Sequence, residues 1–146
     1  MSEADRAGNC IAIRPFEISD YDAVLALWRS GAPGIELRSS DSRAKVAKKC
    51  QRDRELFLVS LLDECIVGVV MGGWDGRRGW IHHLAVSPQA RGQGIARALV
   101  CDLEECLACV GGLKGNLLVR QENSAARSLY TALGYSESPS LLVMGK

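Results

Sequence analysis

A glycine-rich turn that leads directly from a strand into a helix is the feature that most constrains how this chain can fold. Residues 86–96 read VSPQARGQGIA, in which an apolar strand end is followed by Gly92, Gly94 and the start of a helical pattern. The first turn of a helix has unpaired backbone N–H groups and the positive end of the helix dipole, and glycines let a ligand approach the backbone closely. The turn therefore suits a phosphate or pyrophosphate group, unless it serves only to reverse the chain.

Two common phosphate-binding loops do not fit these residues. A Walker-type loop requires GxxxxGK[ST], which the sequence lacks. A Rossmann fingerprint requires a third glycine where this chain has Arg97, and an early strand-helix-strand unit that is also missing. Both alternatives fail on the residues themselves.

The first part of the chain predicts a strand followed by an amphipathic helix. Residues 11–16 alternate apolar and polar side chains, and residues 19–22 offer a capping box. The run at 31–34, rich in glycine and proline, ends the helix, and a loop follows at 35–42. The apolar stripe of the helix is Tyr21, Val24, Leu27 and Trp28.

Residues 43–54 are predicted as a short basic helix with a single acid, Asp53. Its cations are Arg43, Lys45, Lys48, Lys49, Arg52 and Arg54. A solvated helix face accounts for most such runs, and the alternative is a patch that holds phosphate groups or an acidic substrate. The spacing does not select the second interpretation, so the segment has no assigned role.

A meander of three strands comes next. Residues 56–62 and 65–71 are two apolar runs around Asp63 and Glu64, which predicts a hairpin. Residues 72–79 contain an Asp-Gly step that favours a tight turn into a third strand at 80–86.

After the glycine turn, the pattern predicts helix, strand, helix and strand. The first helix is stopped by Gly111 and Gly112, and its stripe is Ala96, Leu99, Leu103, Cys106 and Val110. A short buried strand at 117–119 precedes a helix that Gly134 terminates and whose stripe is Ala126, Leu129, Tyr130 and Leu133. Residues 141–144 supply a last strand. The order predicts an α/β (α+β) fold with a mixed, mostly antiparallel central sheet and helices on both faces.

Length and composition narrow the class of protein further. The 146 residues predict a single domain over 1–146, with residues 1–9 flexible. A net charge of +1 gives no global field for nucleic acid, and the sequence has neither a membrane span nor a signal peptide, so a cytoplasmic location is expected. The six cysteines are interpreted as reduced, and the CxxC spacing of Cys106 and Cys109 has no partner pair, so no metal is expected.

Two spaced motifs resemble those of the GNAT superfamily of acyl-CoA N-acyltransferases. Residues 91–96 (RGQGIA) resemble its R/Q-x-x-G-x-G/A motif, and residues 84–88 resemble the strand before it. Residues 123–135 (NSAARSLYTALGY) resemble the second signature, N-x-x-A-x-x-L-Y-x-x-x-G-F/Y. Two motifs in the right order are far more specific than either alone, and the likeness covers about residues 11–146.

The resemblance implies acetyl-CoA as co-substrate and assigns the residues that bind it. The cofactor-binding residues are Leu84, Ala85, Val86, Arg91, Gly92, Gln93, Gly94, Ile95, Ala96, Asn123 and Tyr130. Backbone amides of residues 93–96 would bind the CoA pyrophosphate, and residues 84–86 would offer backbone hydrogen bonds to the pantetheine arm. Asn123 would lie near that arm.

The implied activity is transfer of the acetyl group to a primary amine of a small molecule or a protein N-terminus. In the family, the acid that protonates the thiolate is usually the tyrosine of the second signature, here Tyr130. The alternatives are a non-catalytic acetyl-CoA sensor and a structural domain without CoA. The family varies its substrate contacts around residues 31–43 and 72–79, a homodimer stays open, and the acceptor is not identified.

The general base is less defined, because the strand before the first motif carries no carboxylate. Its candidates are His82 and His83, which regular alternation sends to opposite faces. His82 shares the parity of Trp80 and Leu84, and it matches a position where arylalkylamine-type family members also carry histidine. His82 is therefore favoured as base or water-orienting residue, with His83 as the rival and a packed histidine as the structural alternative.

Overall fold

Four consecutive strands make up most of a five-stranded sheet whose order follows the chain. A computed structural model describes residues 11–30, 35–111 and 115–146, so the segment 1–9, predicted to be flexible, and the predicted stops at 31–34 and Gly112 lie outside the described residues. The strands are β1 Ile11–Pro15, β2 Phe57–Leu62, β3 Cys65–Trp74, β4 Gly79–Val86 and β5 Asn116–Leu117. Neighbours are antiparallel except for β4 and β5, which are parallel. The predicted mixed, mostly antiparallel sheet is confirmed.

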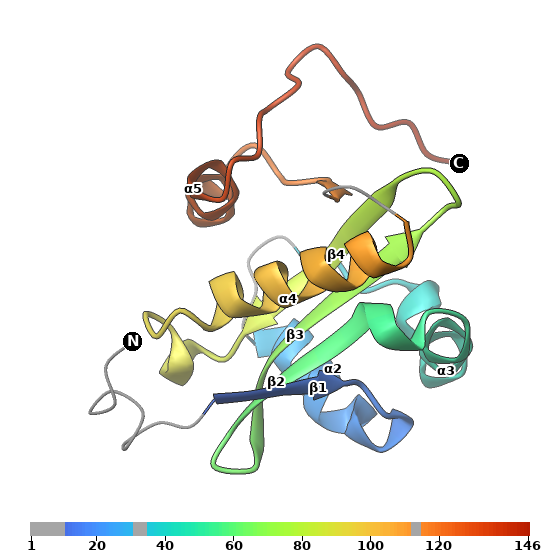
Figure 1. The fold of residues 1–146 in the computed structure, drawn as a ribbon, viewed down its shortest axis with the longest axis vertical. Helices are drawn as coiled ribbons and strands as arrows, with labels where there is room; N and C mark the ends of the chain where they lie inside the picture. Colours follow the sequence, from blue (N-terminus) through green and yellow to red (C-terminus); the bar gives the residue numbers. More distant parts are fainter. Residues whose placement is uncertain (1–10, 31–34, 112–114) are drawn as a thin grey trace.

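Helices cover both faces of this sheet (Figure 1). They are α2 Tyr21–Ser30, α3 Arg43–Arg52, α4 Ile95–Cys109 and α5 Ser124–Ala132, joined by the short turns η1 Ile18–Asp20, η2 Ser39–Asp41, η3 Arg54–Leu56 and η4 Pro88–Ala90. The face under α4 and α5 and the face under α2 and α3 each have their own cluster of buried side chains. No helix in the described ranges is both long and apolar enough to cross a membrane.

The stripe of α2 is buried as predicted, whereas that of α4 differs at its end. Leu99 and Leu103 are fully buried, but Val110 is 40% exposed and Leu107 takes the place predicted for it. The reason is that α4 ends at Cys109, so Val110 no longer follows the helical path. Glycines in the sheet let α4 approach closely, since a β-carbon on Gly72 would lie 2.5 Å from Leu103 Cδ1.

The entry into α2 is tied to β1 by an ion pair. Arg14 Nη1 and Nη2 donate to the two oxygens of the buried Asp20 carboxylate at 2.7 and 3.0 Å, and the Glu17 backbone N–H donates to Asp20 Oδ2 at 2.9 Å. The helix entry is therefore closed by Glu17 and Asp20, three residues apart, and not by the box predicted at 19–22. The hydrogen bond from Arg14 lowers the pKa of Asp20.

The predicted hairpin turn at Asp63 and Glu64 and the predicted end of a helix at Gly134 are both confirmed. Asp63 and Glu64 have φ of 49° and 66°, the left-handed pair that a tight hairpin requires. At the end of α5, Gly134 has φ of 93°, its N–H donates to Thr131 O at 3.0 Å, and Tyr135 N–H donates to Tyr130 O at 2.9 Å. These two hydrogen bonds together form the Schellman motif.

The C-terminal part departs from the prediction. The strand predicted at 117–119 is reduced to β5, and Leu118 is 62% exposed. The strand predicted at 141–144 is wrong, because these residues form no strand and Leu142 and Met144 are 88% and 91% exposed. An apolar run becomes a strand only when another strand offers backbone partners, and these residues have none in the described structure.

Candidate functional site

The turn before α4 has the geometry that an anionic ligand needs. Gly92 and Gly94 have φ of 79° and 78°, and a β-carbon on either would meet no heavy atom within 4 Å. Gly94 is the N-cap, no side chain caps the helix, and the first turn carries no acid. The first intrahelical bond runs from Ala98 N–H to Gly94 O at 3.0 Å, so the N–H groups of residues 95–97 have no intrahelical acceptor. The turn fits a pyrophosphate.

The edge of β4 that leads to this turn is open along half of its length. β5 pairs only with Trp80 and Ile81, so residues 84–86 have no strand neighbour on that side within the described chain. On the other side they pair with β3, through Val69 with Ala85. The predicted pantetheine segment is therefore fixed on one edge and available for backbone hydrogen bonds on the other.

A β-bulge in β4 brings the two histidines to the same face of the sheet. Met71 pairs with His82 and Val69 pairs with Ala85, so two residues of β4 lie opposite one of β3, and His83 has φ of 51°. Such an extra residue reverses the alternation beyond it. The prediction that the histidines point to opposite faces is wrong. His82 does share a face with Trp80, whose ring is parallel to it at 6.4 Å between centroids, but Leu84 packs on the α4 side.

His83 is held by a buried acid from the loop before α3. Its Nε2 lies 2.9 Å from Asp41 Oδ1, and Asp41 is 8% exposed. The other oxygen of Asp41 accepts from the Arg38 backbone N–H at 3.0 Å, and the backbone carbonyl of Asp41 accepts from Tyr21 Oη at 2.7 Å. The Trp28 ring meets His83 edge-on at 5.2 Å. A carboxylate acceptor at Nε2 leaves Nδ1 as the unprotonated nitrogen of a neutral His83.

His82 is the more solvent-exposed of the two histidines, although protein atoms surround much of its ring, and it lies beside a cation. Burial of the ring among its neighbours lowers the pKa of His82, and the charge of Lys49 lowers it further. Both histidines line a cavity of about 300 Å³ whose other walls are Ser40, Asp41, Val46, Lys49 and Met71. A neutral imidazole at such a cavity can accept a proton near pH 7.

Tyr130 lies on the other side of the sheet from this cavity. It is 7% exposed, belongs to the cluster under α4, and meets the Tyr135 ring edge-on at 5.4 Å. Burial raises the pKa of Tyr130, so the phenol keeps its proton at neutral pH. Asn123 is the N-cap of α5, and its side chain accepts from Ala126 N–H at 3.1 Å. The structure thus brings His82 and His83 together, and separates them from Tyr130 by the open edge of β4.

Sequence reasoning missed Asp41 and Lys49 as residues of this cavity. Asp41 lies in a loop whose sequence has no periodicity. Its contact with His83 on β4 is visible only in the folded structure. Lys49 was one cation among several in the basic segment. In the described parts of the chain, no group of three histidine, cysteine or acidic side chains could hold a metal ion.

Several known proteins with a similar sequence or fold are acetyltransferases. The Acetyltransferase (GNAT) family matches residues 21–135. The chain is 39% identical over 134 residues to acetyltransferase SG1711 of Sodalis glossinidius and to acetyltransferase YE1169 of Yersinia enterocolitica, covering 92% of this chain and 93% of each relative.

Solved structures with the same fold include two N-acetyltransferases. PaiA from Thermoplasma acidophilum, in complex with coenzyme A, has a TM-score of 0.75 at 22% identity, over 84% of this chain and 87% of that one. The ribosomal-protein-S18-alanine N-acetyltransferase of Escherichia coli has a TM-score of 0.74 at 24% identity, over 88% and 79%. The family match, the relatives and the open strand edge agree, and the chain belongs to the GNAT family of acetyltransferases, whose co-substrate is acetyl-CoA.

Proposed function

We propose that this acetyltransferase transfers the acetyl group of acetyl-CoA to a primary amine of a small molecule or a protein N-terminus. The observation that carries the proposal is the path of β4, whose open edge at residues 84–86 connects the glycine turn to the histidine cavity. The relatives' names do not specify an acceptor. Among proteins of the same fold, one acetylates the alanine of ribosomal protein S18 and another was solved with L-2,4-diaminobutyric acid and coenzyme A. Both names point to primary amines.

The residues of the turn and strand would hold acetyl-CoA. The backbone amides of residues 93–96 lie at the start of α4, where a pyrophosphate would gain both hydrogen bonds and the helix dipole. Arg91 and Gly92 form the exposed approach to this position. The side-chain oxygen of Asn123 caps α5, which fixes this side chain at the start of that helix.

The chemistry divides between the two sides of β4. When bound, acetyl-CoA supplies the activated acyl group as a thioester. His82 would take a proton from the acceptor amine, directly or through a water molecule, because its lowered pKa favours the neutral imidazole. Tyr130 would give its phenolic proton to the departing sulfur, because a tyrosine phenol is protonated at neutral pH.

An acceptor panel tests this proposal. The purified chain is incubated with acetyl-CoA and primary amines of each class, and consumption of acetyl-CoA is followed together with the mass of the product. Steady turnover with at least one amine supports the proposal. Binding of acetyl-CoA without any turnover would instead identify a sensor. A chain that ignores CoA would be a structural domain, and ligand at 100 times its dissociation constant should otherwise add about 2.7 kcal/mol to the free energy of unfolding.

A further inference from the structure

The histidine cavity carries opposite charges on its walls. Asp41 contributes a carboxylate next to His83, and Lys49 contributes an ammonium next to His82. The two side chains come from different elements, η2 and α3, and both are mostly buried, with side-chain exposures of 10% and 20%. A cavity of about 300 Å³ is at the small end of ligand sites. A small molecule that filled this cavity would lie close to both charges.

Lys49 and the His82 ring converge on one point above β3. The position that a β-carbon on Gly73 would take is 3.7 Å from Lys49 Nζ and 3.8 Å from His82 Nε2. Gly73 leaves that position empty of its own side chain. A ligand group that lies over Gly73, beyond that position, could approach the proton acceptor and the cation at the same time.

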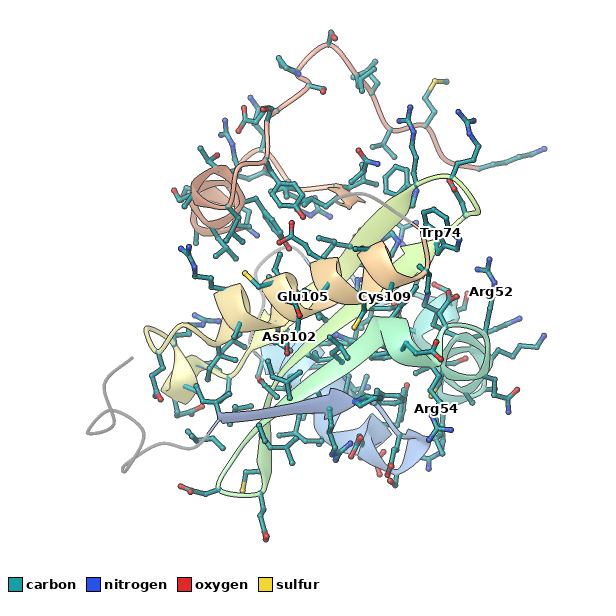
Figure 2. The ribbon with its side chains drawn as sticks, in the orientation of Figure 1. Arg52, Arg54, Trp74, Asp102, Glu105 and Cys109 are labelled. Atoms are coloured by element: carbon teal, nitrogen blue, oxygen red, sulfur yellow. The ribbon has the colours of Figure 1, made fainter. Side chains whose placement is uncertain are left out.

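The cation at this point shares its carboxylate partner with a second cation. Lys49 Nζ lies 2.6 Å from Asp53 Oδ2, but the same oxygen is also 3.6 Å from Arg52 Nη1, so one carboxylate serves two cations. Figure 2 shows Arg52 extending from the end of α3 toward Trp74, whose carbonyl accepts from Arg52 Nη2 at 3.2 Å. An ammonium has three N–H donors, and Asp53 takes one of them. Lys49 can therefore still bind an anion.

A simple cationic amine is a poor occupant of this position. The charge that lowers the pKa of His82 also repels an ammonium group near it. An amine that carries a carboxylate on the adjacent carbon avoids this cost, because the carboxylate meets Lys49 while the amine lies between His82 and the Asp41 side of the cavity.

We propose that the acceptor is a free α-amino acid, whose carboxylate is bound by Lys49 over Gly73 and whose amine faces His82. The inference rests on the proposed acetyl transfer to a primary amine and names the acceptor class for that site. Lys49 is a specificity-determining residue in this account, and the basic segment at 43–54 gains a role through this one side chain.

Binding is measured first, independently of turnover. Calorimetric titrations of the chain saturated with CoA use the standard α-amino acids, each beside its α-carboxamide, which keeps the amine and side chain but loses the negative charge. At least one amino acid should bind about 10- to 100-fold more tightly than its carboxamide, as for a charge-assisted hydrogen bond. Lys49→Met should abolish that ratio. Lys45→Met, which removes an exposed cation of the same helix, should keep it.

A second variant tests the position. Gly73→Ala adds one methyl group at ordinary contact distances of 3.7 to 3.8 Å, so the fold and CoA binding should persist. Its methyl occupies the point shared by Lys49 and His82, and amino-acid affinity should fall about tenfold or more.

The outcomes separate this inference from the proposed function. Equal affinity for acid and carboxamide in the wild type, no binding of either, an unchanged ratio in Lys49→Met, or unchanged affinity in Gly73→Ala each overturns the inference. Acetylation of other amines alongside such a result would leave the proposed function intact. Selective binding of an amino acid with no acetylated product would support the amino-acid site, but it would overturn the proposed transfer and with it the role of the amino acid as acceptor.

Discussion

Replacing Gly94 by alanine separates the backbone role of this residue from its role toward a ligand. Its φ of 78° is left-handed, and an added β-carbon meets no heavy atom within 4 Å, so the variant has no steric clash to relieve. The remaining cost is conformational, about 1–2 kcal/mol for an L-residue in this region. In a chain of this size, each kcal/mol lowers Tm by about 2–4 °C. The variant should therefore fold, with Tm lower by about 2–8 °C.

The same methyl group stands where a pyrophosphate would approach α4. Loss of one hydrogen bond to a charged group costs about 1.5–3 kcal/mol, which corresponds to CoA binding about 10- to 150-fold weaker. Isothermal titration with CoA measures this change directly. Thermal unfolding without ligand measures the conformational cost in the same preparation, so the two effects are determined separately.

Gly76→Ala is the matched control. Gly76 also has positive φ, at 94°, and a β-carbon there also meets nothing within 4 Å. It lies in the turn between β3 and β4, at the opposite end of the molecule from the start of α4 (Figure 1). Its Tm should fall similarly while CoA affinity stays unchanged. If folded Gly94→Ala bound CoA as tightly as the wild type, the assignment of the pyrophosphate to this turn would be wrong.

Three further predictions concern the acid, the base and the ion pair at β1. Tyr130→Phe keeps the buried ring, so CoA affinity and stability should change little while kcat falls about a hundredfold; loss of CoA binding in proportion to rate would refute the acid role. Because burial and the Lys49 charge lower the pKa of His82, kcat/KM should decline only when the pH falls below the ordinary histidine pKa of about 6.5. Lys49→Met removes the charge, so this acidic decline in kcat/KM should move to higher pH. If the same decline persisted in His82→Gln, it would belong to another group. Because the pKa of Asp20 is lowered, its ion pair with Arg14 stabilises the fold fully above about pH 4 and progressively less as the pH falls. In urea titrations, Arg14→Met should therefore lower the free energy of unfolding more at pH 7 than at pH 3. An equal loss at both pH values would contradict this linkage.

The histidine pair shows where a sequence pattern stops being informative. Alternation assigns faces correctly along β4 only up to His82, because the bulge at His83 inserts one residue that has no counterpart in β3. Nothing in the composition of residues 80–86 distinguishes a bulged strand from a regular one. The turns at Gly94 and Gly134 were predictable, since glycine readily adopts left-handed backbone, and the hairpin followed from the two apolar runs around Asp63 and Glu64.

Contacts between distant segments explain the remaining differences. Asp41 and His83 are 42 residues apart, and their pairing depends on how η2 packs beside β4. The apolar residues at 141–144 have the composition of a strand, but composition alone does not supply a neighbour to pair with. The structures of residues 91–96 and 123–135 could be predicted from sequence because each motif is a continuous local structure. The first is the entry to a helix, and the second is a capped helix.

The agreement between strand order and chain order also has a kinetic consequence. Strands β1 to β4 are joined in the sheet in the order in which they occur, and β2 to β4 are linked by short turns, whereas β5 joins only after the 15-residue helix α4 and through two residue pairs. Nearby segments close their contacts at lower entropic cost, so we expect β2 to β4 to form early and the part beyond β5 to dock late. Regions with few tertiary contacts also open most readily in the native state. The wall of the proposed CoA site that carries Tyr130 should thus exchange its amide hydrogens faster than the wall formed by β4. Such opening would let the site widen for a bulky co-substrate while the sheet stays folded.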